Sequence, residues 1–159
     1  MARVTRRVAS IAAALVAVLA LVACGGGTST KDKNAYAEKV NAAQTKFAET
    51  VTTVSQQGGS KNSISQQQKT LRRFETAIEG VVKDLRAIDP PSEVSKEHEQ
   101  LTSVMSGFGK AISDANAAMR NPTPSAIDQA QARISAATQS VNARVNAAIA
   151  AINTKLKGK

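Results

Sequence analysis

The sequence predicts an all-α protein, an antiparallel up-down-up-down four-helix bundle that follows a signal peptide and a flexible tether. Three observations lead to this expectation. Apolar residues recur at steps of three and four, which is the period of one helix face. Prolines and glycines divide this pattern into four stretches joined by short connections, so consecutive helices should lie antiparallel. No stretch alternates apolar and polar residues as a half-buried strand would.

The four expected helices form one domain over residues 34–157. Each carries an apolar stripe on one face, which would pack against the other helices. The helices are expected at about residues 34–57, 63–88, 91–120 and 124–157. The stripe of the third helix is the most regular and consists of Val94, His98, Leu101, Met105, Phe108, Ile112, Ala115 and Met119.

Turn and capping residues set the ends of these helices. Residues 58–60 (Gly-Gly-Ser) close the first helix, and residues 89–91 (Asp-Pro-Pro) close the second, because proline cannot continue a helix. The third stops at residues 121–124, and Pro90 and Pro124 suit a first helical turn. Two capping boxes are predicted, Ser63-x-x-Gln66 and Ser125-x-x-Asp128.

A pair of long helical hairpins that bury their apolar faces only on dimerisation is the alternative architecture. Heptad-like spacing alone does not fix the partner of a helix, so this arrangement stays open at the sequence level. The fourth helix is rich in alanine and should approach its neighbours closely in either case.

The first 23 residues have the character of a secretory signal. Arg3, Arg6 and Arg7 give a positively charged start, and an apolar run follows over residues 8–23, interrupted by Ser10. A run of this length is short for a bilayer span, which needs about 20 residues. A charged start followed by a short apolar run predicts an export signal.

The end of this run, Leu21-Val22-Ala23-Cys24, resembles the lipobox of bacterial lipoproteins. The resemblance implies that the signal is cut before Cys24 and that its thiol carries a diacylglyceryl group, so that acyl chains such as palmitate anchor the protein to the extracytoplasmic face of the cell membrane. Residues 24–33 would be the lipidated cysteine and a flexible tether. An uncleaved transmembrane anchor and a free thiol after ordinary cleavage are the two alternatives.

A second pattern, Pro-Pro-x6-His-x2-Leu, runs from Pro90 to Leu101. It resembles a pattern in small helical lipoproteins of actinobacteria, many of which have no known function. This resemblance implies a helical bundle outside the membrane, with the prolines at the start of a helix and His98 within its first turns. It implies no activity.

Residues 24–159 contain 18 basic and 12 acidic residues, a net charge of +6. Lysines flank the tether and end the chain, where they would contact anionic lipid or a cell-wall polymer, or remain solvated. They are Lys31, Lys33, Lys155, Lys157 and Lys159. No basic stretch is interleaved with aromatic residues, so nucleic acid is not an expected partner. An envelope protein is a further candidate partner.

The sequence offers few groups for catalysis or metal binding. His98 is the only histidine, and no carboxylate lies three residues before or after it, so no Glu-x-x-His metal pair exists. We therefore expect no enzyme, no metal and no cofactor apart from the lipid on Cys24. His98, Gly107, Phe108 and Gly109 form the candidate ligand or packing site. A histidine at the edge of the core and close helix packing at the glycines are the structural interpretations.

Three functions follow from these observations. The first is a membrane-anchored, non-enzymatic binding or interaction module at the cell envelope. The second is a carrier or sensor that holds a small apolar ligand between helices, because the alanine-rich fourth helix and the two glycines leave little side-chain volume. The third is a structural envelope protein that associates with itself, and the sequence does not fix the oligomeric state.

Overall fold

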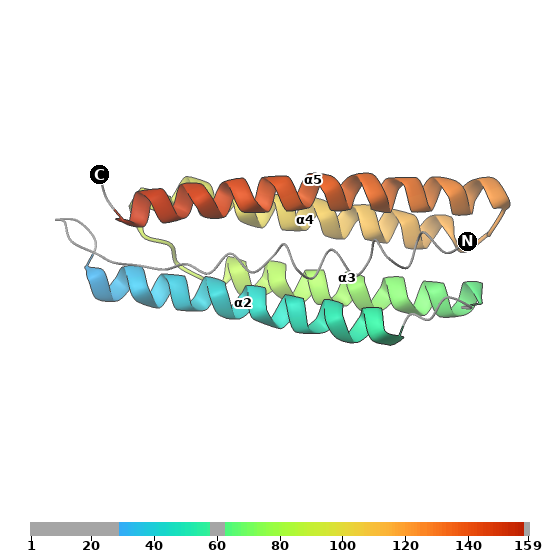
Figure 1. The fold of residues 1–159 in the computed structure, drawn as a ribbon, viewed down its shortest axis with the longest axis horizontal. Helices are drawn as coiled ribbons and strands as arrows, with labels where there is room; N and C mark the ends of the chain where they lie inside the picture. The colour runs from blue at the N-terminus through green and yellow to red at the C-terminus, as the bar shows by residue number, and fades with distance from the viewer. Residues whose placement is uncertain (1–28, 58–62, 158–159) are drawn as a thin grey trace.

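The computed structural model describes residues 29–57 and 63–157, and within them it contains four long α-helices, one short 3-10 helix and no strand. The helices form an elongated up-down-up-down bundle, as predicted, with α4 and α5 along one side and α2 and α3 along the other (Figure 1). The elements are α2 (Thr30–Gln57), α3 (Ile64–Arg86), η1 (Ser92–Val94), α4 (Ser95–Ala118) and α5 (Pro124–Lys157).

The two ends of the bundle differ in how many helices they contain. At one end, the Thr30 end, α2 begins, α5 ends and the α3–α4 connection lies (Figure 1). At the other, the Pro124 end, α2 stops short of α3 and α5 (Figure 1). The lengths explain the difference, because α2 has 28 residues, or about 42 Å, and α5 has 34 residues, or about 51 Å.

The predicted apolar stripes form the core. Every member of the stripe of the third helix is buried, including His98. Burial is most complete toward the Thr30 end, where Leu85, Ile152 and Leu156 have 2% or less of their surface exposed. Toward the Pro124 end, Phe74 is only partly buried, in common with Leu71 and Ile134. The missing continuation of α2 accounts for this gradient.

The helix ends confirm one predicted capping box and correct the other. Ser63 Oγ accepts from Gln66 N at 3.3 Å, and Gln66 Oε1 accepts from Ser63 N at 3.1 Å. The box at Ser125-x-x-Asp128 is wrong, because α5 already begins at Pro124, as predicted for that proline. The cap therefore falls at Thr123, two residues before the predicted Ser125, where Thr123 Oγ1 accepts from Ala126 N at 3.2 Å.

The start of the third helix also differs from the prediction. Pro90 does not begin a helix but lies in the connection, and Pro91 precedes the 3-10 helix η1. The α-helix α4 begins only at Ser95. A single 3-10 turn therefore joins the two prolines to α4, which is a common use of that tighter helix as a connector.

The predicted tether over residues 24–33 is too long at its C-terminal side. Helix α2 begins at Thr30, four residues before the predicted start, and Ser29 caps it. Ser29 Oγ accepts from Asp32 N at 3.1 Å and donates to Asp32 Oδ2 at 2.7 Å. Asp32 in the first turn also complements the helix dipole. Cys24, the signal segment, residues 58–60 and Lys159 lie outside the described residues.

Candidate functional site

His98 lies in a polar cluster at the Thr30 end of the bundle, inside an otherwise apolar core. Its Nδ1 is 3.2 Å from the hydroxyl oxygen of Tyr36, which comes from the first turns of α2. The two rings meet edge to face, with centroids 5.6 Å apart and planes at 66°. Both side chains are almost fully buried, with 5% of His98 and 2% of Tyr36 exposed.

The second ring nitrogen of His98 contacts the end of α3. Its Nε2 lies 3.0 Å from the carbonyl oxygen of Leu85, one of the carbonyls that the last helical turn leaves without an α-helical partner. A carbonyl oxygen only accepts, so Nε2 carries the proton and donates it. In this tautomer, Nδ1 of the neutral ring accepts the Tyr36 hydroxyl proton, and one imidazole joins α2, α3 and α4.

Lys33 makes the second link of this cluster. Its Nζ lies 3.2 Å from Glu93 Oε1 in η1 and donates to the carbonyl oxygen of Leu156 at 3.3 Å. That carbonyl belongs to the last turn of α5, where cations are favoured by the helix dipole. Lys33 is 7% exposed, so it is not the solvated or lipid-contacting lysine that the sequence predicts.

The third link joins α4 to α5 next to His98. Glu97 Oε1 lies 2.9 Å from Lys155 Nζ. The hydrogen bond from Lys155 lowers the pKa of Glu97 from its ordinary value, although burial acts in the opposite direction. Burial raises the pKa of the Tyr36 hydroxyl far above its ordinary value, and the negative charge of Glu97 raises it further. Tyr36 therefore stays a neutral hydrogen-bond donor.

Together these contacts tie all four helices at one end. The hydrogen bonds satisfy both nitrogens of His98 and leave neither facing solvent, so the ring has no open position for a substrate or a metal ion. Glu97 Oε2 is the buried acceptor of this cluster that has no hydrogen-bond partner among the described residues. The arrangement is suited to holding the first turns of α2 against the rest of the bundle.

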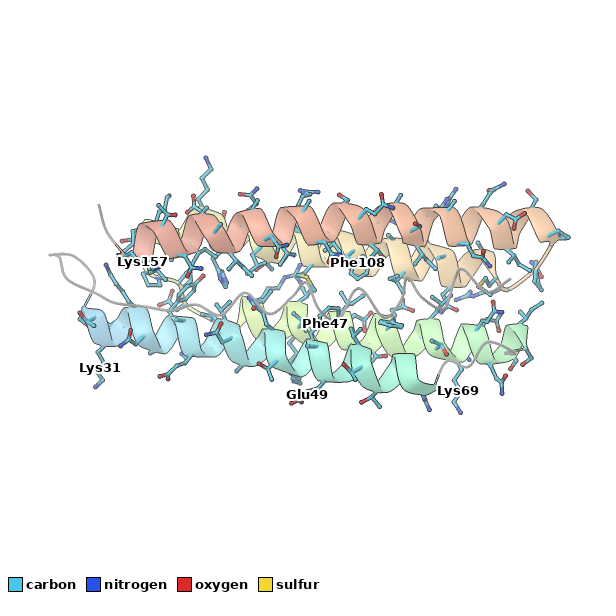
Figure 2. All side chains as sticks on the ribbon, in the orientation of Figure 1. Lys31, Phe47, Glu49, Lys69, Phe108 and Lys157 are labelled. Carbon is cyan, nitrogen blue, oxygen red and sulfur yellow. The ribbon has the colours of Figure 1, made fainter. Side chains whose placement is uncertain are left out.

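The other predicted site residues lie further along α4 and do not join this cluster. Phe108 is a buried core residue (Figure 2). A side chain at Gly109 would place its Cβ 3.1 Å from Ile78 Cγ2, so this glycine allows α3 and α4 to approach closely. Gly107 is exposed, and a Cβ there would meet nothing within 4 Å. Gly109 therefore serves packing.

A small enclosed pocket lies among residues of all four helices, between the two ends. It is lined by apolar side chains such as Phe47 and Met105 together with Gln44, and its volume is about 20 Å³. A water molecule needs roughly 10 to 15 Å³ measured in this way, so this pocket has no room for a lipid or other apolar ligand. It does not supply the space that a carrier function requires.

The described helices contain neither a group of metal-ligating side chains nor a helix able to span a membrane. Over residues 29–57 and 63–157, no three or more metal-ligating side chains are grouped closely enough to hold a metal ion. None of the helices in the same part of the chain combines the length and the apolar character that a membrane span requires.

Comparison of the chain with protein-family models, with curated proteins and with solved structures yields no match.

Sequence reasoning identified His98 but missed the residues around it. Lys33 and Lys155 are predicted to contact lipid or a cell-wall polymer or to remain solvated, and the sequence analysis assigns no site role to Tyr36, Glu93 or Glu97. One signal was available, because a tyrosine and a histidine on apolar stripes both need hydrogen-bond partners when they are buried. The sequence does not say that these two stripes face each other.

Proposed function

We propose that this protein is a lipid-anchored, extracytoplasmic lipoprotein that acts as a non-enzymatic binding module at the cell envelope. The observation that carries the proposal is Leu21-Val22-Ala23-Cys24, which follows a charged start and a short apolar run. Cys24 stands six residues before Thr30, where α2 begins. A short tether of this kind would hold the bundle close to the membrane, and two acyl chains on one cysteine anchor a protein far better than one.

Features of the Thr30 end support this arrangement. The chain enters the bundle there, and the links made by Lys33 and Tyr36 hold the first turns of α2 against the other three helices. A pull on the tether would therefore reach the whole bundle. Lys31 and Lys157 are exposed at the same end (Figure 2), where an anionic membrane surface would attract them.

The non-enzymatic part of the proposal is supported by the surroundings of His98. Its two nitrogens are engaged by Tyr36 and Leu85, and the ring is buried. A general base must reach the proton that it abstracts, directly or through one water. A hydrolase or transferase activity that is lost in His98→Gln, in a variant with an unchanged circular dichroism spectrum, would contradict this part of the proposal.

The decisive experiment determines the mass of the N-terminal peptide after expression of the full chain in bacteria. The wild-type protein is expected in the membrane fraction, with its N-terminus at Cys24 and a mass increase that corresponds to a diacylglyceryl group. Cys24→Ala should lack the increase. A Ser10→Ala variant is the matched control, because it changes the apolar run and leaves the motif intact.

An unmodified Cys24 on a chain that still begins at Met1 would overturn the anchoring proposal. The same holds for a soluble wild-type protein cut at another site. A wild-type protein that carries the lipid but lies on the cytoplasmic face, as judged by protease protection in intact cells, would overturn the proposed location.

A further inference from the structure

An open groove runs between α2 and α3, in the half of the bundle toward the Pro124 end. Its volume is about 630 Å³, and the buried Val81 and half-buried Ala77 lie along its inner side. It lies outside the polar cluster around His98. The sequence analysis assigned no role to the residues that line it.

Among the described residues, four cations and no acidic residue line the groove. They are Lys46 of α2 and Lys69, Arg72 and Arg73 of α3. Asp84 Oδ2 lies 2.8 Å from Lys46 Nζ, and this carboxylate compensates the charge of Lys46. Over residues 29–57 and 63–157, neither Lys69 nor Arg72 has an ion-pair partner, and both are exposed. Figure 2 shows Lys69 projecting outward from the bundle.

These groups are arranged as a stripe along α3. Lys69, Arg72 and Thr76 follow one another at steps of three and four, so they share one helix face and span about 10 Å along the axis. The next position at the same step is Gly80, where a Cβ would meet nothing within 4 Å. The groove therefore stays open at its inner end.

Of the three threonine hydroxyls along the groove, one adds a free hydrogen-bond donor to the stripe. Thr50 and Thr53 line the α2 side, and each donates its proton to a carbonyl oxygen of its own helix, at 2.8 and 2.9 Å. The hydroxyl of Thr76 makes no such bond among the described residues. Thr76 can therefore donate to an anion that Arg72 holds in the groove.

The exposure of these cations determines which anions they can hold. A single exposed ion pair contributes about 0 to 1 kcal/mol, so one phosphate ion would bind weakly. A chain of phosphates contacts several cations at once and releases condensed counterions, which multiplies the weak contacts. Arginine suits phosphate in particular, because its planar guanidinium donates two parallel hydrogen bonds. None of the described residues that line the groove is aromatic, so nucleobases have nothing there to stack on.

We propose that the groove between α2 and α3 binds a linear phosphodiester polymer without bases, of the polyol phosphate kind. Lys69 and Arg72 contact successive phosphates, Thr76 donates to the phosphate that Arg72 holds, and the half-buried Ala77 lies against the carbon chain. This inference rests on the proposed function, since it names the partner class of a binding module outside the membrane.

The test uses the full chain in a non-ionic detergent and a fluorescently labelled poly(glycerol phosphate) oligomer. Fluorescence anisotropy over a range of salt concentrations gives the affinity and its salt dependence. The Lys69→Glu/Arg72→Glu variant should bind at least tenfold more weakly than wild type. The slope of log affinity against log salt should become shallower by about 1.4, because each phosphate contact on a flexible strand contributes about 0.7.

The matched control is Arg133→Glu/Arg144→Glu, which makes the same change of net charge at exposed positions of α5. It should bind within about threefold of wild type. An equal loss in both variants would mean that only net charge matters, and it would overturn the site. No binding of the polymer by wild type at low salt would overturn it as well.

This experiment and the lipidation experiment fail independently. Binding in detergent does not require a lipid on Cys24, so a bound polymer with an unmodified Cys24 would refute the anchor and leave the groove in place. A lipidated protein that does not bind the polymer would refute the groove alone. Circular dichroism spectra of both charge variants show that the helices are intact in each case.

Discussion

The two ends of the bundle differ in how completely apolar residues are buried and in whether charged residues are paired. At the Thr30 end four helices meet, the apolar core is fully covered, and buried charges are paired, as Lys33 is with Glu93 and Glu97 with Lys155. At the Pro124 end α2 is missing from the last turns, and Leu71 is only partly buried. The nearby cations of the α2–α3 groove remain at the surface.

This difference indicates that the two ends of the bundle are suited to different roles. Charges that are paired and buried hold helices together but are closed to other molecules, whereas exposed cations add little stability and remain accessible. The Thr30 end is thus suited to joining the bundle to the proposed tether. The half with the groove is suited to contact with the proposed polymer. The predictions that follow test whether stability is really concentrated at the first of these ends.

The largest difference is expected for a pair of isoleucines in α5. Ile149→Ala removes a side chain that is 1% exposed, and it should cost about 2 to 5 kcal/mol of unfolding free energy. Ile134→Ala, toward the Pro124 end, removes a side chain that is only partly buried. It should cost about 1 kcal/mol, because the folded protein loses less buried apolar surface than it does at Ile149. Both variants replace an isoleucine of α5 with alanine, so the change in helix propensity is the same in each and cancels in the comparison.

Urea unfolding of the full chain, followed by far-UV circular dichroism, measures both costs. Equal losses for the two alanine variants would show that the core is uniform along its length. The comparison between the ends would then fail.

The next largest effect is expected at the Tyr36–His98 pair. Tyr36→Phe keeps the ring but removes the hydroxyl, which leaves Nδ1 of His98 without its donor. A buried acceptor without a partner costs about 1 to 3 kcal/mol, so urea unfolding should show a loss of that size. Thr154→Ala is the control at the same end, because its exposed hydroxyl only bonds to its own helix, and it should cost under about 0.5 kcal/mol.

A double-mutant cycle shows whether the pair itself is responsible. Tyr36→Phe combined with His98→Gln should cost less than the sum of the two single changes, because residues in one hydrogen-bonded contact are coupled. Additive costs would mean that the two side chains stabilise the bundle separately, and the proposed link between α2 and α4 would be wrong.

The sequence predicts the bundle well because helix periodicity and burial are coupled at every turn. The stripe from Val94 to Met119 is buried throughout, and the capping box at Ser63 forms as expected. The misplaced boundaries have local causes. Pro124 takes the first helical position and moves the cap of α5 to Thr123, and the cap at Ser29 extends α2 into the predicted tether.

The candidate sites are predicted less well because they depend on residues far apart in the chain. Lys33 looks like a solvated lysine until the fold places Glu93 and the end of α5 beside it. The groove has the same origin, since Lys46 and Arg72 belong to different helices that only the hairpin brings together. The role of Cys24 stays a prediction, because it depends on processing and lies outside the described residues.

The smallest effect is expected at Glu97, and pH reveals it. The bond from Lys155 lowers the pKa of Glu97 in the folded state, so this contribution to stability is present above the unfolded value of about 4.5 and is lost as pH falls below it. Glu97→Gln should therefore show a smaller decrease of unfolding free energy between pH 7 and pH 3 than wild type, by urea unfolding at each pH. The control Glu99→Gln, at an exposed position of the same helix, should follow the wild-type profile. If Glu97→Gln also follows it, the pair with Lys155 does not stabilise the Thr30 end, and the joining of α4 to α5 there depends on apolar packing alone.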